Sequence, residues 1–273
     1  MQTLLIEDRG HARCITLNRP QQRNAMSLQM VEELLQQLEA AETDRNLRAL
    51  VLRGSGGHFC AGGDIADMLS AQQRAADGDS DAFYNMNRRF GELLCRFNDT
   101  HLVVIAALEG AVMGGGFGLA CIADLCLAAH SARFSLPETR LGLPPAQIAP
   151  FVAARLGQFQ ARRLALGGRA IDAAEAARIG LVHQLADNSA DLETALDEQL
   201  QAIRACAPAA LATTKQLLRN TATASDRESL SSLLDSAARD FARAIAGEGR
   251  EGAQAFIEKR PPDWDKAPQG KQS

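Results

Sequence analysis

The sequence predicts an α/β fold in which a parallel-sheet core is followed by a helical C-terminal region. Two apolar stretches, residues 48–53 and 102–108, are each followed by a glycine-rich turn and then by a helical pattern, which is typical of parallel strands joined by crossover helices. After Phe151 the chain becomes rich in alanine and poor in strand-forming residues. At 273 residues the chain is long enough to bury a substantial core.

The first elements are predicted to be a hairpin and a helix. Segments 3–7 and 12–18 favour strands, and residues 8–10 between them have the composition of a turn. Ser27 is a suitable N-cap for a helix that extends to about Thr43, because leucine and valine recur there at helical spacing.

The middle of the chain contains the second and third predicted strands. Residues 48–53 form an apolar strand that ends in the turn Gly54-Ser55-Gly56-Gly57. Residues 71–81 are small, polar and acidic, so we expect a mobile surface excursion before a helix over residues 82–97. The continuous apolar run 102–108 predicts a buried strand.

Short strands are predicted at residues 125–129 and 132–135, and prolines interrupt the chain before the next helix. We divide the chain into a core, residues 1–190, and a helical assembly region, residues 191–273. The helical segments expected after residue 170 are 172–179, 192–205 and 208–221.

Composition excludes several classes of protein. A net charge of −4 argues against nucleic-acid binding, which needs a clustered basic excess. The longest apolar runs are too short to cross a bilayer, and residues 1–8 have no features of a signal peptide. We therefore expect a cytoplasmic protein with no membrane or nucleic-acid partner.

The six cysteines are scattered and form no C-x-x-C pair, which indicates reduced thiols and no metal framework. His58 and Cys60 are two residues apart and suggest a nucleophile and its base as one alternative. A buried, inert cysteine is the other, and no acid partner for the pair is identifiable.

The two glycine-rich turns, residues 59–64 and 113–118, each follow a predicted strand. Such turns can present backbone N–H groups at the start of a helix, where they suit a phosphate or a developing oxyanion. Neither turn matches a nucleotide-binding motif. The alternative interpretation is that the glycines only allow tight packing of strand against helix.

With further motifs these turns resemble the enoyl-CoA hydratase/isomerase, or crotonase, superfamily almost from end to end. The resemblance includes Asp124 after the second turn. The other motifs are Leu17-Asn18-Arg19-Pro20, Arg23-Asn24-Ala25-Met26, Ser135-Leu136-Pro137-Glu138-Thr139-Arg140-Leu141-Gly142-Leu143 and Glu251-Gly252-Ala253-Gln254-Ala255-Phe256-Ile257-Glu258-Lys259-Arg260.

The resemblance implies a crotonase fold, a ββα spiral core with a C-terminal helical region for assembly into trimers or dimers of trimers. It implies an acyl-CoA thioester substrate whose carbonyl oxygen is bound by the amides of Ala61 and Gly115, while Glu138 transfers protons. Coenzyme A is part of the substrate, and no metal or redox cofactor is implied. The residues implied in coenzyme A and substrate binding are Arg23, Ala25, Ala61, Gly62, Gly63, Asp64, Ile65, Gly114, Gly115, Phe256 and Lys259.

The sequence departs from the family pattern at Gly118, where hydratases with two catalytic glutamates have the second one. A single glutamate resembles the site of enoyl-CoA double-bond isomerases. A hydratase also remains feasible if Glu138 both activates the water and returns its proton. Glu109 and Asp64 are the nearby acids, of which Asp64 belongs to the common loop pattern.

Residues 140–152 favour the hydratase, because they resemble bacterial isohexenylglutaconyl-CoA and methylglutaconyl-CoA hydratases. The expected function is hydration of a branched 2-enoyl-CoA, of 3-substituted glutaconyl type, in acyclic terpene or leucine catabolism. Arg140 is a candidate for a second substrate carboxylate, although a structural role for it is the stronger interpretation. The alternatives are a double-bond isomerase, an acyl-CoA hydrolase and an RNA-binding relative.

Overall fold

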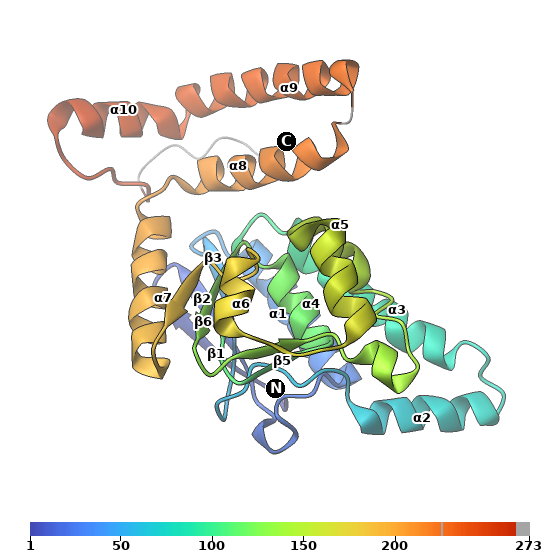
Figure 1. The fold of residues 1–273 in the computed structure, drawn as a ribbon. Coiled ribbons are helices and arrows are strands. Elements are labelled where there is room, and N and C mark those ends of the chain that lie inside the picture. Colours follow the sequence, from blue (N-terminus) through green and yellow to red (C-terminus); the bar gives the residue numbers. More distant parts are fainter. Residues whose placement is uncertain (225, 266–273) are drawn as a thin grey trace. The chain divides into compact units, whose positions relative to one another are not determined.

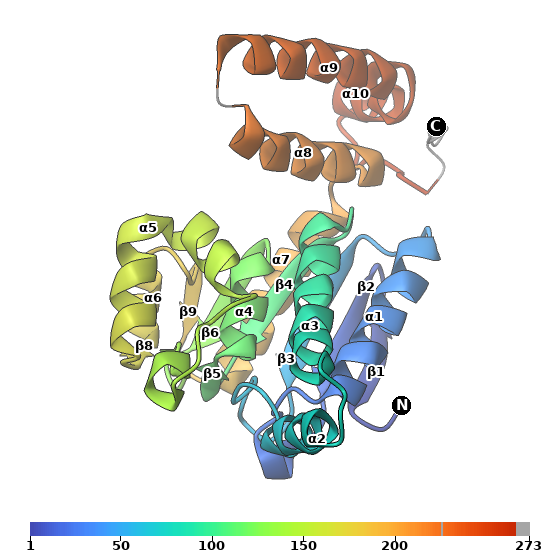
Figure 2. The same ribbon diagram turned by 90° about the vertical axis from the view of Figure 1, so that its right-hand side faces the viewer.

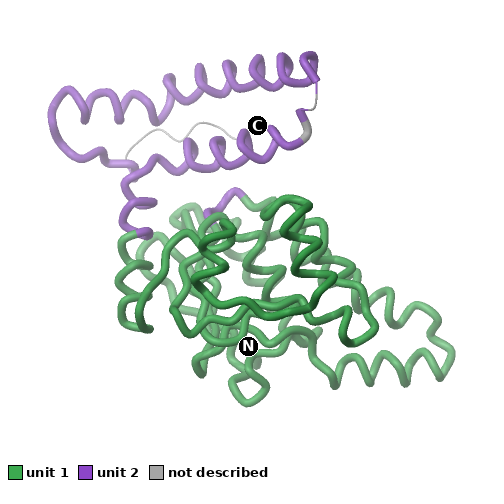
Figure 3. The backbone as a smooth tube through the Cα atoms, viewed as in Figure 1, with its two compact units in different colours: residues 1–100, 104–198 green, residues 101–103, 199–273 purple. Residues whose placement is uncertain are grey.

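The structure is a computed structural model that describes residues 1–224 and 226–265 and divides into two compact units (Figures 1 and 3). Unit 1 consists of residues 1–100 and 104–198, and unit 2 of residues 101–103 and 199–273. The end of the predicted assembly region, residues 266–273, lies outside the described residues. The sequence-based boundary at residue 190 and the division after residue 198 both fall within helix α7 (Ser189–Arg204).

Within the described residues, the larger sheet has six strands in the order β1-β2-β3-β4-β6-β9. The predicted hairpin pairs β1 and β2 antiparallel, whereas β2 with β3, β4 with β6, and β6 with β9 pair parallel. These strands are β1 (Leu4–Arg9), β2 (Ala12–Leu17), β3 (Ala49–Gly54), β4 (Val103–Leu108), β6 (Leu125–Ala129) and β9 (Gln184–Ala186). The predicted α/β core is therefore confirmed.

A second, smaller sheet contains β5 (Ala111–Met113), β7 (Arg133–Ser135) and β8 (Ile171–Asp172). Strand β7 lies in the middle, parallel to β5 and antiparallel to β8. The sequence predicted β7 but not β5, β8 or β9: residues 111–113 were assigned to the glycine-rich turn, and β8 and β9 have only two and three residues.

Helices α1 (Leu28–Thr43), α3 (Ala82–Asp99) and α4 (Gly115–Ile122) cover one face of the larger sheet, and the first part of α7 lies on the other (Figures 1 and 2). Ser27 caps α1 as predicted, because its hydroxyl accepts a hydrogen bond from Met30 N–H. The remaining helical segments of unit 1 are η1 (Pro20–Gln22), α2 (Ile65–Ala76), η2 (Glu138–Leu141), α5 (Ala149–Gly167) and α6 (Ala173–Arg178).

The expected mobile excursion over residues 71–81 was wrong for its first half, because helix α2 continues to Ala76. Asp64 caps this helix at its start, and Ala71 is completely buried. The helix-forming residues alanine, glutamine and arginine therefore extend the helix despite their polar character. Only residues 77–81 connect α2 to α3.

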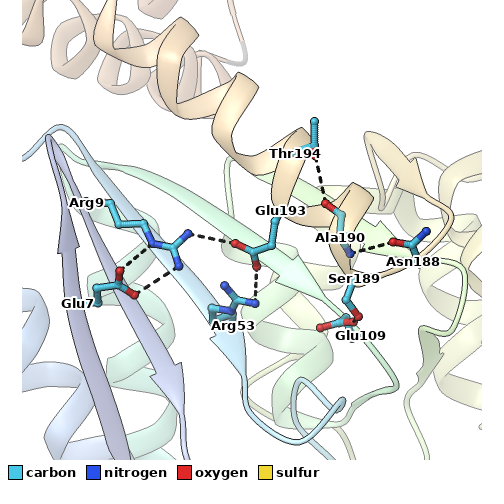
Figure 4. A network of polar contacts seen from close by, with 9 residues as sticks. All are labelled: Glu7, Arg9, Arg53, Glu109, Asn188, Ser189, Ala190, Glu193 and Thr194. Carbon is cyan, nitrogen blue, oxygen red and sulfur yellow. Dashed lines mark hydrogen bonds and ion pairs between the residues drawn. The ribbon is translucent and has the colours of Figure 1, made fainter.

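A network of ion pairs joins α7 to the larger sheet (Figure 4). Glu193 on α7 lies 3.0 Å from Arg9 of β1 and 2.5 Å from Arg53 of β3. At the start of the same helix, Ser189 donates a hydrogen bond to Glu109, which follows β4. Because one carboxylate serves two arginines here, the network fixes the helix better than an isolated surface pair does.

Unit 2 contains the helices α8 (Pro208–Asn220), α9 (Arg227–Ala246) and α10 (Glu248–Glu258), with η3 (Thr221–Thr223) after α8. The buried Glu248 accepts hydrogen bonds from the N–H groups of Ala209 and Ala210 in the first turn of α8. A carboxylate at the N-terminal end of a helix accepts hydrogen bonds from its free amides and is attracted to the positive end of the helix dipole. None of the helices in the described ranges has the length and hydropathy needed to span a membrane.

Replacing Glu248 with alanine should destabilise unit 2, since the first turn of α8 loses its acceptor. We expect a loss of about 1 to 2 kcal/mol of unfolding free energy, the cost of losing a strong helix cap. Chemical denaturation monitored by circular dichroism measures the change. Glu228→Ala, at an exposed position in the first turn of α9, is the matched control and should change stability by less.

Candidate active site

Strand β7 positions Glu138 beside the second glycine turn. The pairing of β5 with β7 places Met113 opposite Ser135, and Gly114 N–H donates to the carbonyl of Ser135 at 3.0 Å. Leu136 and Pro137 follow, and Glu138 is the first residue of η2. The predicted proton-transfer residue is thus held close to the turn that carries Gly115.

Glu138 also lies against the first glycine turn. A Cβ at Gly114 would be 3.0 Å from Glu138 Oε1 and 3.4 Å from Gly62 Cα. Gly114 has φ of 50° and ψ of −115°, a conformation that a side chain strains. The backbone conformation favours glycine here, and the missing side chain leaves room for the carboxylate beside Gly114.

The Glu138 carboxylate is poorly solvated. Its Oε2 atom is buried and has no hydrogen-bond partner among the described residues. Burial raises the pKa of Glu138 above its ordinary value, because the charged form is desolvated. A raised pKa makes the carboxylate a stronger base, as a group that must both accept and return a proton requires.

The structure corrects the predicted role of Ala61. The N–H of Ala61 already donates to the carbonyl of Arg23 at 3.0 Å, so it is not free to bind a substrate oxygen. The next residues bridge to the same segment, with Met26 N–H donating to Gly62 O and Asp64 N–H donating to Met26 O. In a strand, successive N–H groups point to opposite sides, so Gly63 N–H points away from Met26.

Gly63 and Gly115 are the better pair of amide donors. Neither N–H has a protein acceptor within residues 1–224 and 226–265. Gly115 is the first residue of α4, where the N–H groups are free and the helix dipole is positive. The two turns lie together, since Cys60 bridges to Val112 and Met113 N–H donates to Cys60 O at 2.9 Å. Fixed amides of this kind stabilise an oxyanion.

The other predicted binding residues of unit 1 differ in whether they are accessible to a ligand. The Asp64 side chain is engaged, because it caps α2 at Ala66 N–H and lies 2.5 Å from an Arg19 nitrogen, so its role is structural. Ile65 is 72% exposed and Arg23 is exposed, so both side chains are accessible to a ligand. The carbonyl of Ala25, by contrast, accepts a hydrogen bond from Arg19.

Phe256 and Lys259 lie in unit 2, at the end of α10. The Phe256 side chain is 85% exposed, and Lys259 is exposed in a left-handed backbone conformation. Their contact with coenzyme A stays a prediction.

Apolar side chains fill the space beside Gly118. A Cβ at this position would be 3.3 Å from the Ile148 side chain and 3.5 Å from Leu94. On the same side of α3, the Phe90 ring lies 3.1 Å from a Cβ placed at Gly115. We call Phe90, Leu94 and Ile148 the apolar wall, of which Ile148 and Leu94 border the position of the second glutamate and Phe90 borders Gly115.

The nucleophile alternative for His58 and Cys60 is wrong. The thiol is fully buried, and burial raises the pKa of Cys60 to about 11. The His58 ring faces elsewhere, because its Nδ1 accepts a hydrogen bond from Ala111 N–H at 3.0 Å. The part of the chain that the structure describes contains no group of three histidine, cysteine or acidic residues arranged to hold a metal ion.

Residues 10–267 match the family described as "Enoyl-CoA hydratase/isomerase". A relative, the 2,3-dehydroadipyl-CoA hydratase of Escherichia coli K12, is 32% identical over 266 residues, which cover 97% of this chain and 99% of that protein. The chain belongs to the enoyl-CoA hydratase/isomerase family, and it is an enzyme of the enoyl-CoA hydratase type. The resemblance noted in the sequence is confirmed.

Solved structures with the same fold support this assignment. An enoyl-CoA hydratase/isomerase from Marinobacter aquaeolei has a TM-score of 0.92 and 52% identity, with coverage of 97% of this chain and 100% of that one. Pseudomonas aeruginosa AtuE has a TM-score of 0.90 and 53% identity over the same shares of the two chains. The crotonase fold expected from the motifs is thus confirmed.

The raised pKa of Glu138 predicts how the stability of the protein changes with pH. The folded-state pKa is raised, so protonated Glu138 contributes to the stability of the folded protein. This contribution is fully present below the ordinary glutamate pKa of about 4.3 and is lost as the pH rises through the folded-state pKa. Glu138→Gln should therefore melt at a higher temperature than the wild type at pH 8, and this difference should shrink towards pH 4. Calorimetry across this range measures it.

Glu39→Gln, at an exposed position on α1, is the control and should show no such trend. A Glu138→Gln difference that stayed constant with pH would contradict the buried, unpartnered carboxylate.

Proposed function

We propose that this enzyme reversibly hydrates a branched 2-enoyl-CoA of the 3-substituted glutaconyl type, isohexenylglutaconyl-CoA or 3-methylglutaconyl-CoA. The observation that carries the proposal is one half-buried carboxylate, Glu138, whose buried Oε2 has no partner and which lies beside Gly114, next to two turns whose Gly63 and Gly115 amides have no acceptor among the described residues. These groups supply a base and an oxyanion hole, which are the two requirements of the reaction.

In the proposed mechanism the thioester carbonyl accepts hydrogen bonds from Gly63 and Gly115. Glu138 takes a proton from water as the water oxygen bonds to C3, and the electrons of the double bond move through C2 to the carbonyl oxygen. The amides stabilise this enolate. Protonated Glu138 then returns the proton to C2, so one carboxyl group completes the cycle and the net change is addition of one water.

The apolar wall supports a branched substrate. Phe90, Leu94 and Ile148 offer hydrocarbon contacts beside the oxyanion turn, and Ile148 and Leu94 would pack against the Cβ of any side chain at Gly118. A hydrophobic branch at C3 would gain from this surface. The Escherichia coli relative named above acts on a dicarboxylic thioester, which is chemically close to a glutaconyl group.

The position of Arg140 is explained without a second carboxylate on the substrate. Its side chain packs over Gly168, with atoms 3.0 to 3.2 Å from the place of a Cβ there. A structural role at the end of α5 accounts for this contact, so the glutaconyl assignment rests on residues 140–152 as a whole.

Further parts of the proposal follow from the family resemblance. Coenzyme A enters as part of the substrate, along Arg23 and the Ala61–Ile65 turn, and no other cofactor takes part. Self-association as a trimer or a dimer of trimers is supported by exposed apolar side chains on α9. These are Leu230, Leu234, Phe241 and Ile245. We place the enzyme in the cytoplasm, in the catabolism of acyclic terpenes or leucine.

A panel of thioesters tests the reaction. The purified enzyme is incubated with crotonyl-CoA, a 3-enoyl-CoA, 3-methylglutaconyl-CoA and isohexenylglutaconyl-CoA, and products are resolved by mass and retention time. We expect a gain of one water on a glutaconyl substrate, with kcat/KM ranking the two. An unchanged mass with a shifted double bond would instead support the isomerase, in which Glu138 carries a proton between carbons.

Glu138→Gln should lower kcat by about 100- to 10,000-fold, the usual contribution of a general acid–base group. Binding of coenzyme A should be retained, since the amide has the shape of the carboxyl group. Stopped-flow assays and calorimetric titration measure the two quantities, with Glu39→Gln as the control. Activity close to that of the wild type would refute the mechanism.

Gly118→Glu tests the apolar wall. The substitution alone should impair folding or activity, because it places a carboxylate against the apolar side chains of Ile148 and Leu94. Gly118→Glu combined with Ile148→Ala frees this space and should raise kcat/KM on crotonyl-CoA above that of Ile148→Ala alone. If the double variant gained nothing, Gly118 would not lie opposite Glu138.

A further inference from the structure

His58 is half-buried and Asn24 is buried, and the proposed mechanism uses neither, yet both contact the main chain that leads into the glycine turns. His58 Nδ1 accepts a hydrogen bond from Ala111 N–H at 3.0 Å. The side-chain nitrogen of Asn24 donates to the carbonyls of His58, at 2.7 Å, and Ser55, at 2.9 Å. Asn24 is completely buried, and its side-chain oxygen accepts from Arg19 N–H at 2.8 Å.

The contact between His58 and Ala111 lies at the junction of the two turns. Next to it, Phe59 N–H donates to Glu109 O and Cys60 N–H donates to Ala111 O, both at 2.8 Å. The hydrogen bond from Ala111 N–H to the His58 side chain therefore adds a third bond to these two main-chain bonds. It also gives an acceptor to the N–H of Ala111, which is a buried residue.

Gly110 allows the imidazole to reach this position. A Cβ at Gly110 would be 2.4 Å from His58 Nδ1 and 2.2 Å from Gly57 O, and the backbone has φ of 52°. The ring thus lies directly on the main chain that leads into β5. Because β5 has only three residues, a shift at Ala111 is transmitted within one strand to Gly114 and Gly115.

Asn24 binds the main chain just before the first glycine turn, at Ser55 and His58. Arg23 and Asn24 both have positive φ, and the Arg23 carbonyl accepts the N–H of Ala61. The three hydrogen bonds of the Asn24 side chain stabilise this strained loop and fix the backbone of His58. Asn24 and His58 together connect the segment before α1 with the residues that precede the two glycine turns.

We propose that His58 is a positioning residue of the oxyanion hole: its backbone carbonyl is held by Asn24, and its neutral imidazole, accepting from Ala111 N–H, sets the register between the turn that carries Gly63 and the turn that carries Gly115. The ring proton is then on Nε2, since Nδ1 is the acceptor. The proposal rests on the proposed function in one respect, that the two amides bind a thioester carbonyl.

Amide replacements of His58 separate positioning from simple packing. In asparagine the side-chain oxygen falls near the place of Nδ1, so His58→Asn keeps an acceptor for Ala111 N–H. In His58→Gln the oxygen lies one bond farther out, and His58→Leu has no acceptor. His130→Leu, at an exposed position, is the control.

The readout is the absorption band of bound 4-(dimethylamino)cinnamoyl-CoA, which moves to longer wavelength as its carbonyl accepts stronger hydrogen bonds. The band reports the hydrogen bonds of the carbonyl without any proton transfer or turnover. We expect the wild type, His58→Asn and His130→Leu to show the full shift, and His58→Gln and His58→Leu to lose most of it. In these two variants kcat should fall about 100- to 1,000-fold, as on loss of one oxyanion donor.

The Kd for coenzyme A itself should stay within a factor of two or so of the wild-type value in the variants that fold, because no nucleotide contact changes. A wild-type shift in His58→Gln or His58→Leu, or its loss in His58→Asn, would overturn the positioning role. If His58→Leu fails to fold, the comparison of asparagine with glutamine decides. A wild-type enzyme that binds the probe with no shift would overturn the oxyanion hole itself, and the positioning role with it.

Discussion

Main-chain hydrogen bonds hold residues 23–26, 59–64 and 109–115 side by side, and the candidate active site depends on them. Each such bond contributes only about 1 kcal/mol net, but leaving a buried partner unpaired costs more. None of the three segments can therefore shift alone. The bond from Gly114 to Ser135 connects this arrangement to β7, so the base and the amide donors belong to one hydrogen-bonded unit.

Elements with many residues and a clear period were predictable from the sequence. Helix α1 begins after Ser27 and ends at Thr43 as expected, because its cap and its apolar face are both local signals. Strands β8 and β9 were missed, since they are formed by pairing with β7 and β6 and carry no local signal of their own. Residues 71–76 were misjudged because polarity was weighed above helix propensity.

The site was predictable where side chains carry the chemistry and less so where the backbone does. Glu138 was identified from its motif, and the structure adds its burial and its unpartnered oxygen. The assignment of the donor to Ala61 was wrong because successive amides of one turn look alike in sequence. Their partners, Arg23 and Met26, are more than thirty residues away. The sequence also showed the loss of an acid at Gly118 without showing that Ile148 and Leu94 occupy the space.

Since main-chain atoms would bind the carbonyl, a substitution other than proline leaves these N–H groups in place as long as the backbone keeps its course. Acyl preference, by contrast, would depend on exchangeable hydrocarbon side chains such as Leu94 and Ile148. Binding of the thioester carbonyl and preference for the acyl group are thereby encoded separately, so the acyl preference can change while carbonyl binding is retained. Such a division makes the scaffold evolvable: new substrates require a few substitutions along one wall, and saturation libraries confined to those positions should yield altered specificity without inactivating most clones.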